Sequence, residues 1–453
     1  MDLKEKKTLV VGLARTGVAL ASFLARQGAR VAVTDQAPPE ALEESRRELQ
    51  GFDVVEELGV PQPADVEGYD LILLSPGVPP EAPWLIPARE AGVPVWGELE
   101  LAARFFTLPV LAVSGTNGKT TTTALLGELL RAAGFRPLVG GNIGTAATTL
   151  LSRQSEGTHL VLEVSSFQLD TAPHFHPQAA ALLNVTPDHL DRYPDLGAYA
   201  SSKAGLFRNQ GPGDLAVLNH DAPLLRELPL GRQRVRYFSA RQALPEGAWL
   251  EDEVLRVRSA PGREAVFPLK QIRLPGRHNL ENIMAALLLA LDAGADPAAC
   301  REVLARFGGL PHRLEWVAAI DGVDYVDDSK GTNVGAVARA LASFDRPVVL
   351  IAGGRDKDSD FTLLSPLIRE RVKALVLLGE TREHLAQVWD GLAPVHLSAH
   401  LAQAVHQARQ LARPGDVVLL SPACASFDMF RDYAHRGETF QHLVKEVAHA
   451  QKG

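Results

Sequence analysis

The sequence predicts an α/β protein of three domains. The N-terminal and C-terminal domains are expected to be Rossmann-like, and the central domain to have the parallel sheet of a P-loop ATPase with a small β insertion. Two observations predict this architecture. Short apolar runs alternate with helical patterns along the 453 residues, and such alternation is typical of parallel strands joined by crossover helices. The length allows roughly two to four domains, and we place three, at 1–97, 98–308 and 309–453.

The expected N-terminal domain begins with an apolar run and ends near Gly97. Gly28 follows a helical pattern at 18–27 and is expected to end that helix, as glycine commonly does. Short runs rich in Val, Ile and Leu predict buried parallel strands, and these lie at 8–12, 31–35, 70–75 and 93–96.

The other two domains repeat this alternation. In the central domain, strands are expected at 110–114, 159–163 and 179–184, helices at 121–133 and 279–293, and short strands with turns over 215–275. In the C-terminal domain, helical stretches alternate with strands at 325–327, 348–352, 374–378 and 417–421. Sheets of this kind bind their ligands at the carboxyl ends of the strands.

Composition limits the class of function. Hydrophobic residues make up 46% and charged residues 22% of the chain, which is ordinary for a globular protein. A net charge of −8 indicates neither a nucleic-acid partner nor a membrane surface, and no apolar run reaches the ~18–20 residues of a membrane helix. The N-terminus lacks the pattern of a signal peptide, and Cys300 and Cys424 fit no metal-ligand spacing. We expect a cytoplasmic monomer that acts on small molecules.

The strongest motif is a phosphate-binding loop at 114–121. Its sequence, Ser-Gly-Thr-Asn-Gly-Lys-Thr-Thr, follows an expected strand and opens an expected helix. Glycines let backbone N–H groups turn toward phosphate oxygens, and the helix N-terminus adds partial positive charge. Lys119 would reach the β- and γ-phosphates, and the Thr120 hydroxyl would bind Mg²⁺. The alternative, an ordinary glycine-rich turn, does not account for strand, loop, Gly-Lys-Thr and helix together.

Three further residues are candidates for a metal site beside this loop. Glu163 ends an expected buried strand and His189 follows the next one, so both strand ends open toward the nucleotide. Alone, each of these two residues is more often structural than metal-binding. Lys203 would ordinarily be a solvated helix residue. However, of the eleven lysines only Lys119 and Lys203 lie between positions 8 and 269, which favours a functional role.

The segment at 12–17, Gly-Leu-Ala-Arg-Thr-Gly, is similar to a dinucleotide-binding fingerprint, with Asp35 at the end of the next strand. Ala14 occupies the place of the second glycine, which would let the backbone approach a pyrophosphate. This difference disfavours NAD, whereas the helix N-terminus still favours an anionic nucleotide.

Three loops of the C-terminal domain carry polar residues directly after strands. They are Asp-Asp-Ser-Lys-Gly-Thr-Asn at 327–333, Gly-Gly-Arg-Asp-Lys-Asp-Ser at 353–359 and Ser-Pro-Ala-Cys-Ala-Ser-Phe-Asp at 421–428. Turn chemistry explains any one of them. Because all three follow strands of one sheet, a ligand site at that edge is the better interpretation. No base is identifiable that would make Cys424 a nucleophile.

Together, these motifs resemble those of the Mur ligase family over nearly the whole chain. The matching segments are 115–120, 140–144, 163–169, 184–192, 276–279, 310–313, 328–333 and 421–426. Ser-Pro-Gly at 75–77 and Ser-Ser-Phe-Gln-Leu at 165–169 resemble the D-glutamate-adding branch of the family. The Asp-Asn-Pro-Arg motif of the diamino-acid-adding branch does not occur in the sequence.

The resemblance implies an ATP-dependent ligase that adds D-glutamate to UDP-N-acetylmuramoyl-L-alanine in peptidoglycan synthesis. Phosphoryl transfer to the substrate carboxylate would make an acyl phosphate, which the D-glutamate amine attacks. Two Mg²⁺ ions and a carbamate formed by CO₂ on Lys203 are also implied. The resemblance makes Lys119, Glu163, His189 and Lys203 the catalytic group.

The resemblance also assigns residues to each ligand. ATP would be bound by Gly115, Thr116, Asn117, Gly118, Lys119, Thr120, Thr121, Asn282, Arg313 and Asp328. The metal ligands would be Thr120, Glu163, His189 and carbamylated Lys203. The UDP-sugar substrate would be bound by Arg15, Thr16, Gly17, Asp35, Ser75, Gly77, Asn142 and His189. D-Glutamate would be bound by Lys330, Thr332, Lys357, Ser426, Phe427 and Tyr433.

Three other functions share part of this pattern. A ligase like folylpolyglutamate synthase would share the central domain but would not need the loops at 12–17 and 75–77. An NAD-dependent dehydrogenase would use the first domain and would not need a phosphate loop. A non-catalytic nucleotide-binding regulator would leave the metal ligands and the three C-terminal loops without a role.

Overall fold

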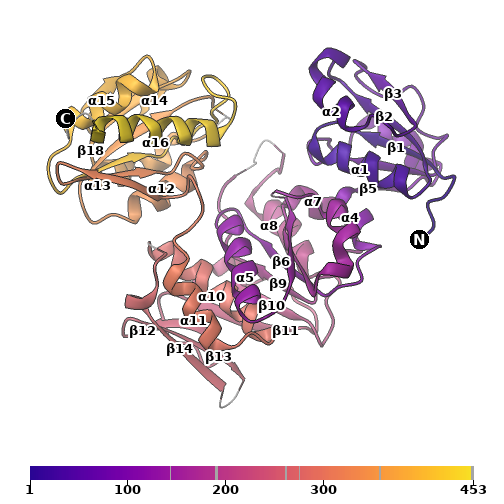
Figure 1. The fold of residues 1–453 in the computed structure, drawn as a ribbon, viewed down its shortest axis with the longest axis horizontal. Coiled ribbons are helices and arrows are strands. Elements are labelled where there is room, and N and C mark those ends of the chain that lie inside the picture. Colours follow the sequence, from indigo (N-terminus) through magenta and orange to yellow (C-terminus); the bar gives the residue numbers. More distant parts are fainter. Residues whose placement is uncertain (143, 189–191, 261–262, 275, 357–358, 450–453) are drawn as a thin grey trace. The chain divides into compact units, whose positions relative to one another are not determined.

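The computed structural model describes residues 1–142, 144–188, 192–260, 263–274, 276–356 and 359–449. The chain divides into two compact units. The first unit comprises Met1–Val185, Tyr193–Ile272 and Glu281–Arg306, and the second comprises Thr186–Arg192, Arg273–Leu280 and Phe307–Gly453. Across the described residues, two sheets belong to the first unit and one to the second (Figure 1). These sheets confirm the predicted fold class, while the boundaries at 97/98 and 308/309 stay predictions.

The N-terminal sheet has parallel strands in the order β3-β2-β1-β4-β5. The strands are β1 Lys7–Val11, β2 Arg30–Asp35, β3 Val54–Leu58, β4 Leu71–Leu74 and β5 Val95–Gly97. The helices are α1 Arg15–Arg26, α2 Glu43–Glu48 and α3 Ile86–Glu90, with 3-10 turns η1 Pro39–Leu42 and η2 Pro83–Leu85. Successive residues of β1 pack in different cores, so both faces of the sheet are covered. The chain leaves β1 and β4 on opposite sides, which opens a crevice at their carboxyl ends.

The central sheet has the order β14-β13-β12-β11-β10-β9-β6-β8-β7. Its strands are β6 Val110–Ser114, β7 Pro137–Gly141, β8 His159–Glu163, β9 Ala179–Leu182, β10 Leu215–Asn219, β11 Arg234–Ser239, β12 Gly247–Glu251, β13 Val254–Ala260 and β14 Arg263–Pro268. All neighbouring strands are parallel except β12, β13 and β14, which form an antiparallel extension. This extension corresponds to the predicted small β insertion.

Helices surround the central sheet. They are α4 Glu98–Ala103, α5 Lys119–Ala132, α6 Ala147–Leu150, α7 Ser166–Asp170, α8 Leu196–Ala204, α9 Pro223–Arg226, α10 Arg277–Asp292 and α11 Pro297–Arg306, with 3-10 turns η3 Leu151–Glu156, η4 Gly205–Phe207 and η5 Leu269–Gln271. Because β6 lies between β9 and β8, the loop after β6 is flanked by the ends of both neighbours. That position places the phosphate loop at the middle of one sheet edge.

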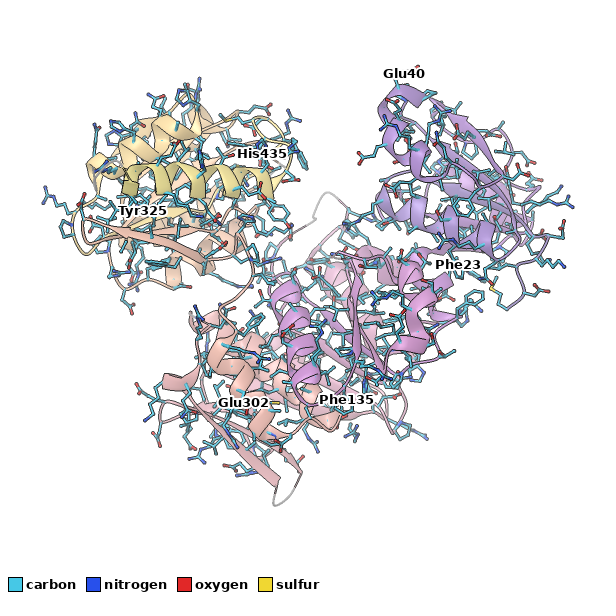
Figure 2. All side chains as sticks on the ribbon, in the orientation of Figure 1. Phe23, Glu40, Phe135, Glu302, Tyr325 and His435 are labelled. Carbon is cyan, nitrogen blue, oxygen red and sulfur yellow. The ribbon has the colours of Figure 1, made fainter. Side chains whose placement is uncertain are left out.

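Helix α4 joins the two sheets of the first unit and contributes to both cores. Leu99 packs in the core of the central sheet, whereas Leu101 packs in the core of the N-terminal sheet. The buried carboxylate of Glu98 accepts a hydrogen bond at 2.5 Å from a backbone N–H at the start of α6. Phe23 of α1 (Figure 2) meets Phe105 edge to face, with ring centroids 5.2 Å apart. The chain is therefore anchored on both sides of this junction.

The C-terminal sheet has the order β15-β16-β20-β17-β18-β19 and is parallel apart from the β15–β16 pair. Its strands are β15 Glu315–Ile320, β16 Val323–Asp327, β17 Val348–Gly353, β18 Val372–Leu378, β19 Val395–Leu397 and β20 Val417–Leu420. The helices are α12 Val334–Ala342, α13 Ser365–Arg371, α14 Arg382–Val388, α15 Leu401–Leu411 and α16 Tyr433–His449, with the 3-10 turn η6 Phe361–Leu364. Helices α12 to α14 cover one face, and α15 and α16 cover the other.

Strand β20 lies between β16 and β17, so the loops that follow these three strands emerge side by side. This arrangement confirms that the loops beginning at 327, 353 and 421 share one edge of the sheet.

No helix among the described residues combines the length and the apolar content that a bilayer crossing requires.

Candidate active site

The phosphate loop connects β6 to α5, and its backbone conformation depends on glycine. Gly115 and Gly118 have φ angles of 152° and 84°, which L residues rarely adopt. Asn184, just beyond β9, fastens the loop from the neighbouring strand. Its carbonyl accepts from the N–H of Thr116 at 2.9 Å, and its side chain bonds the N–H and the carbonyl of Asn117 at 2.9 and 3.1 Å. The loop is thus fixed at the start of α5, which is an anion-binding position.

Two lysines converge on one backbone oxygen of this loop. Lys119 Nζ donates to the carbonyls of Gly115 and Thr116 at 2.7 and 2.8 Å, and Lys203 Nζ donates to the Gly115 carbonyl at 3.1 Å. Because both nitrogens contact the same oxygen, they lie within about 6 Å of each other, where like charges repel. Lys203 is 1% exposed, and its Nζ lies 4.5 Å from the centre of the Tyr199 ring. Lys203 is therefore not a solvated helix residue.

Glu163 ends β8 beside the phosphate loop and is 2% exposed. In the β6–β8 pairing it lies opposite Val113. Asn142 holds the carboxylate from the other side, because its Nδ2 donates to Oε1 at 2.8 Å. The second oxygen, Oε2, is buried and has no hydrogen-bond partner among the described residues. A buried carboxylate oxygen that accepts from no donor fits a ligand of Mg²⁺, which prefers oxygen atoms.

Other predicted nucleotide residues lie around the same loop. Thr120 and Thr121 belong to the first turn of α5, where Thr120 is half-buried and Thr121 is buried. Asn282 of α10 contacts the loop closely, since a Cβ built on Gly118 would lie 2.2 Å from its Oδ1. The structure thus brings the loop, Asn142, Glu163, Lys203 and Asn282 to one end of the central sheet. His189 lies outside the described residues.

A separate cavity of about 240 Å³ lies at the carboxyl ends of β1, β2 and β4, where Gly12, Asp35 and Gly77 line it. The Asp35 carboxylate accepts backbone N–H bonds at 2.6 and 2.8 Å from the segments that follow β1 and β2. The Ser75 hydroxyl donates to the Gly12 carbonyl at 2.8 Å. These bonds hold the cavity walls together at the crevice of the doubly wound sheet. The structure therefore brings Asp35, Ser75 and Gly77 together.

Arg15, Thr16 and Gly17 form the first turn of α1. A Cβ on Gly17 would lie 1.9 Å from the Gly12 carbonyl oxygen, so only glycine lets the helix pack so closely on the preceding loop. Arg15 is exposed and lines another cavity of about 450 Å³, between α1 and the segment 144–154. Arg15 is not among the residues that line the cavity containing Asp35.

In the second unit, Asp328 follows β16 and is buried. Its Oδ2 accepts from the Ser421 hydroxyl at 2.7 Å, and its Oδ1 accepts from the Leu314 N–H at 3.3 Å. Burial raises the pKa of this carboxyl from 3.8 to about 7. Asp328 therefore links the segment after Arg313 to the loop after β20, and it is positioned at the shared strand edge.

Among the described residues, the predicted amino-acid ligands lie on two of the three loops at this edge and at the start of α16. Lys330 Nζ lies 3.6 Å from the centre of the Tyr433 ring, which is a cation–π contact. Thr332 is half-buried on the same loop. On the loop after β20, Ser426 is buried whereas Phe427 is 63% exposed. Lys357, on the third loop, lies outside the described residues.

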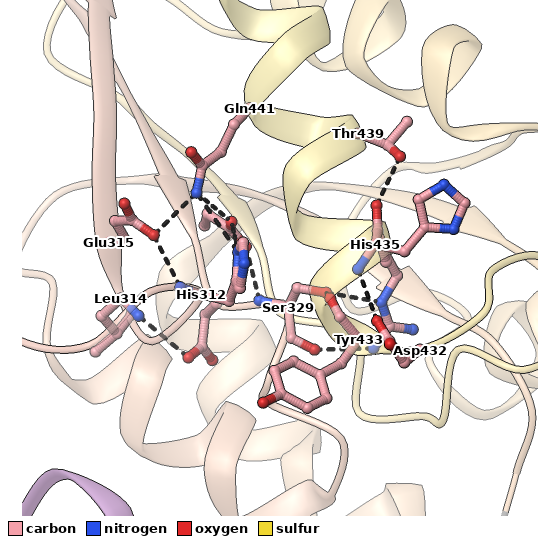
Figure 3. Close-up of polar contacts among 12 residues, drawn as sticks. His312, Leu314, Glu315, Ser329, Asp432, Tyr433, His435, Thr439 and Gln441 are labelled. Atoms are coloured by element: carbon pink, nitrogen blue, oxygen red, sulfur yellow. Dashed lines mark hydrogen bonds and ion pairs between the residues drawn. The ribbon is translucent and has the colours of Figure 1, made fainter. Parts of the chain in front are cut away.

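Sequence reasoning missed a polar network behind this edge (Figure 3). His312 Nδ1 lies 2.7 Å from Asp327 Oδ2, and Gln441 Nε2 donates to Asp327 Oδ2 and Glu315 Oε2 at 2.9 Å each. The hydrogen bond that His312 donates to the Asp327 carboxylate holds the pKa of His312 above its usual range. Arg436, also on α16, is buried beside this network. The available signal was Leu-Pro-His-Arg at 310–313, of which only Arg313 entered the predicted site.

A phosphate loop, a buried carboxylate beside it and polar strand-end loops, carried on three α/β sheets, are the parts expected of a nucleotide-dependent enzyme. Models of protein families match each part of the chain. The Mur ligase MurD-like N-terminal domain matches residues 6–97, the Mur ligase middle domain matches 113–290, and the Mur ligase glutamate ligase domain matches 312–424. The chain belongs to the Mur ligase family.

Individual proteins agree with this assignment. UDP-N-acetylmuramoylalanine–D-glutamate ligase of Geobacter metallireducens is 47% identical over 449 residues, which cover 99% of both chains. A ligase of the same name from Pelotomaculum thermopropionicum is 45% identical over 98% of both chains. The solved structure of UDP-N-acetylmuramate-alanine ligase from Thermotoga maritima has a TM-score of 0.59 at 19% identity, covering 98% of this chain and 100% of that one. The last likeness shows a shared fold.

Proposed function

We propose that the protein is an ATP-dependent ligase that joins D-glutamate to UDP-N-acetylmuramoyl-L-alanine, with release of ADP and phosphate. The observation that carries this proposal is the 47% identity over 99% of both chains to a ligase of that name. The geometry supports it, because Lys119 belongs to the phosphate loop and Glu163 lies beside that loop. The step belongs to the cytoplasmic synthesis of peptidoglycan.

The chemical difficulty of this reaction is the approach of two anions. The substrate carboxylate must meet the γ-phosphate of ATP, and two like charges 4 Å apart repel by ~4 kcal/mol at an effective dielectric constant of 20. The Lys119 ammonium on the phosphate loop offsets part of this repulsion. Mg²⁺ held at this site would supply further positive charge. Glu163 and Thr120 are the described residues that we assign to metal binding, and His189 is a further ligand by family resemblance.

We further propose that Lys203 carries a carbamate. The ammonium first loses one proton; CO₂ then adds to the neutral amine, a nitrogen–carbon bond forms and a second proton leaves, so that a cation becomes an anion. Two observations support this: Lys203 is almost wholly buried, and its Nζ shares the Gly115 carbonyl with Lys119. The modification removes the like-charge repulsion between the two side chains. It also provides a carboxylate on a long stem, which suits a second Mg²⁺.

The two remaining subsites follow from the strand edges. We assign the UDP-sugar to the cavity lined by Asp35 and Gly77, and D-glutamate to the loops that carry Lys330 and Ser426. Lys330 offers positive charge to an amino-acid carboxylate, while the Ser426 hydroxyl offers a hydrogen bond. Attack of the amine on the acyl phosphate forms the amide and releases phosphate. Closure of the domains would exclude water from that intermediate.

The test is phosphate release from ATP with each pair of carboxylate donor and amino acid. Release is expected only when UDP-N-acetylmuramoyl-L-alanine and D-glutamate are both present, and L-glutamate serves as the matched control. Release with a folate and glutamate, but not with this pair, would support the folylpolyglutamate alternative. Nucleotide binding without any release would support the regulator.

The carbamate has its own test. Lys203→Ala is expected to lose most activity and to regain part of it with added short carboxylic acids, which replace the missing carboxylate. Lys270→Ala is the control, because Lys270 is exposed on η5. Full activity of Lys203→Ala would remove the carbamate role and leave the ligase assignment intact.

A further inference from the structure

The guanidinium of Arg436 is buried in the second unit and is 2% exposed. Within the described residues, its hydrogen bonds go to oxygen atoms of two loops. Nε donates to the Ser329 hydroxyl at 3.0 Å, and NH2 donates to the carbonyls of Ser329 and Cys424 at 2.9 and 3.2 Å. NH1 donates to the Ala425 carbonyl at 3.4 Å. A single planar group therefore bridges the loop after β16 and the loop after β20.

Burying a charged group is expensive unless its hydrogen bonds compensate for lost hydration. Burial lowers the pKa of Arg436 to about 10, so the group stays protonated at neutral pH. Its planar fork matches several carbonyl oxygens at once, which a lysine ammonium does not reproduce. The contacts of Arg436 thus fix the separation of the two loops as well as their orientation.

The same contacts reach the predicted amino-acid site. The Ser329 hydroxyl, which accepts from Arg436, donates to the Tyr433 carbonyl at 2.8 Å. The Tyr433 ring in turn lies under the Lys330 ammonium. On the other loop, Ala425 directly precedes Ser426. Arg436 therefore bonds to the carbonyls of Ser329 and Ala425, the two residues that directly precede the candidate D-glutamate ligands.

The neighbouring network of His312, Glu315, Asp327 and Gln441 does not carry a ligand site. The ligand atoms of His312, Glu315 and Asp327 lie within 4.8 Å of one another, which could suggest a metal site. However, the Gln441 amide nitrogen already donates to both carboxylates. Because hydrogen bonds satisfy this cluster internally, it gives no ground for a metal. It does provide a control, since Gln441 lies on the same helix as Arg436 and, among the described residues, its side chain donates hydrogen bonds to Glu315 and Asp327 rather than to the 424–426 loop.

We propose that Arg436 is a positioning residue for the acceptor amino acid, which holds the 329–332 and 424–426 loops so that Lys330 and Ser426 meet one D-glutamate molecule. The proposal rests on the proposed function for the identity of the amino acid. The bridge between the loops does not depend on that identity, so it has a separate readout.

The experiment compares Arg436→Lys and Arg436→Met with Gln441→Met in the full-length protein. KM and kcat are measured for D-glutamate at saturating ATP and UDP-N-acetylmuramoyl-L-alanine, and then for ATP at saturating D-glutamate. Arg436→Lys is expected to raise KM for D-glutamate about 10- to 100-fold, as the loss of charge-assisted hydrogen bonds predicts, with KM for ATP changed by less than about 3-fold. Arg436→Met is expected to be worse, and Gln441→Met to leave KM for D-glutamate unchanged.

Amide hydrogen exchange of the loops at 328–333 and 421–428 supplies the separate readout. Both loops are expected to exchange faster in Arg436→Lys but not in Gln441→Met. Unchanged KM for D-glutamate and unchanged exchange would overturn the inference. A fall in kcat with a parallel rise in both KM values and a lowered melting temperature would also overturn it, because the residue would then be purely structural. If the wild type does not use D-glutamate at all, the proposed function fails, while the exchange result still decides the role of Arg436.

Discussion

Replacing Gly118 by alanine should damage the phosphate loop in two separable ways. The first is conformational, because the residue has a φ of 84°, and an L residue in the left-handed region costs roughly 1–2 kcal/mol. The second is steric. The new Cβ would lie 2.2 Å from Asn282 Oδ1 and 3.1 Å from Leu183 Cδ1, so that Asn282, which is 5% exposed, must move. Overpacking of this kind typically costs about 1–3 kcal/mol.

The chain offers a matched control at the other end of the same helix. Gly134 follows α5 and has a φ of 87°, but a Cβ built there meets nothing within 4 Å. Gly134→Ala therefore carries the conformational cost without the steric one. The entropy that alanine removes from the unfolded chain, roughly 0.4–1 kcal/mol, is the same in both variants and cancels. Gly118→Ala should thus be less stable than Gly134→Ala by about 1–3 kcal/mol.

Urea unfolding of the two variants measures this difference, and both residues report on the same compact unit. KM for ATP should rise in Gly118→Ala and stay near the wild-type value in Gly134→Ala, since only the first variant displaces Asn282. The double variant Gly118→Ala with Asn282→Ala should recover part of the lost stability, because the obstructing side chain is gone. Equal destabilisation by the two single variants, or no recovery in the double variant, would refute the steric argument.

Three further predictions concern other parts of the structure. In the wild type, the folded pKa of Asp328, about 7, exceeds the unfolded value of 3.8, so the stability of the second unit should fall between pH 4 and 7 by at most ~4 kcal/mol. Asp328→Asn should remove this fall. Unfolding followed by the fluorescence of Trp316 and Trp389 at each pH should report the difference. The raised pKa of His312 adds a fall above pH 6.5 that this variant retains. Glu163→Gln should reduce phosphate release at least ~100-fold with a nearly unchanged melting temperature, because the amide oxygen still accepts from Asn142; substantial activity would count against a metal ligand. Cys300 and Cys424 are buried with pKa values raised to about 11 by burial, so an aromatic disulfide reagent should react with them only after unfolding.

Some strands that are buried on both faces could be predicted to the residue, although β7, which is also largely buried, was not predicted. β6 and β8 begin and end where continuous apolar runs predict, because every side chain of such a strand meets a hydrophobic core. β3 was not predicted. It is an edge strand with the sequence Val-Val-Glu-Glu-Leu and a partly exposed pattern, so that neither an apolar run nor strict alternation marks it.

The first residues of helices were also predicted less accurately than their central turns. α5 and α10 begin two residues before the predicted positions 121 and 279. Their first turns carry polar residues, which have no apolar periodicity and are fixed by the loops that precede them. Sequence patterns therefore locate the cores of helices better than the turns that face the ligands.

Candidate residues that lie within a motif were brought together by the fold, as the loop, Glu163 and Lys203 illustrate. Arg436 and Gln441 were not found, because their partners lie 107 and 114 residues away along the chain and a charged or amide side chain on a helix ordinarily indicates a solvated face. One local sign was present. Gly437 lies within α16 between them, and a Cβ there would lie 2.2 Å from His312 Nδ1, so a helical glycine marked a close approach.

Helix α4 packs in two hydrophobic cores, and this limits which chimeras between this protein and its relatives can fold. Leu99 and Leu101 stand two positions apart and fill different cores. A chimera that crosses over between them would combine half of one interface with half of another, and would lose a buried leucine contact on at least one side. A successful exchange of the N-terminal domain must therefore bring α4 with it together with the surfaces that receive both leucines. The segment that must be exchanged as a whole is consequently longer than the one that forms the N-terminal sheet.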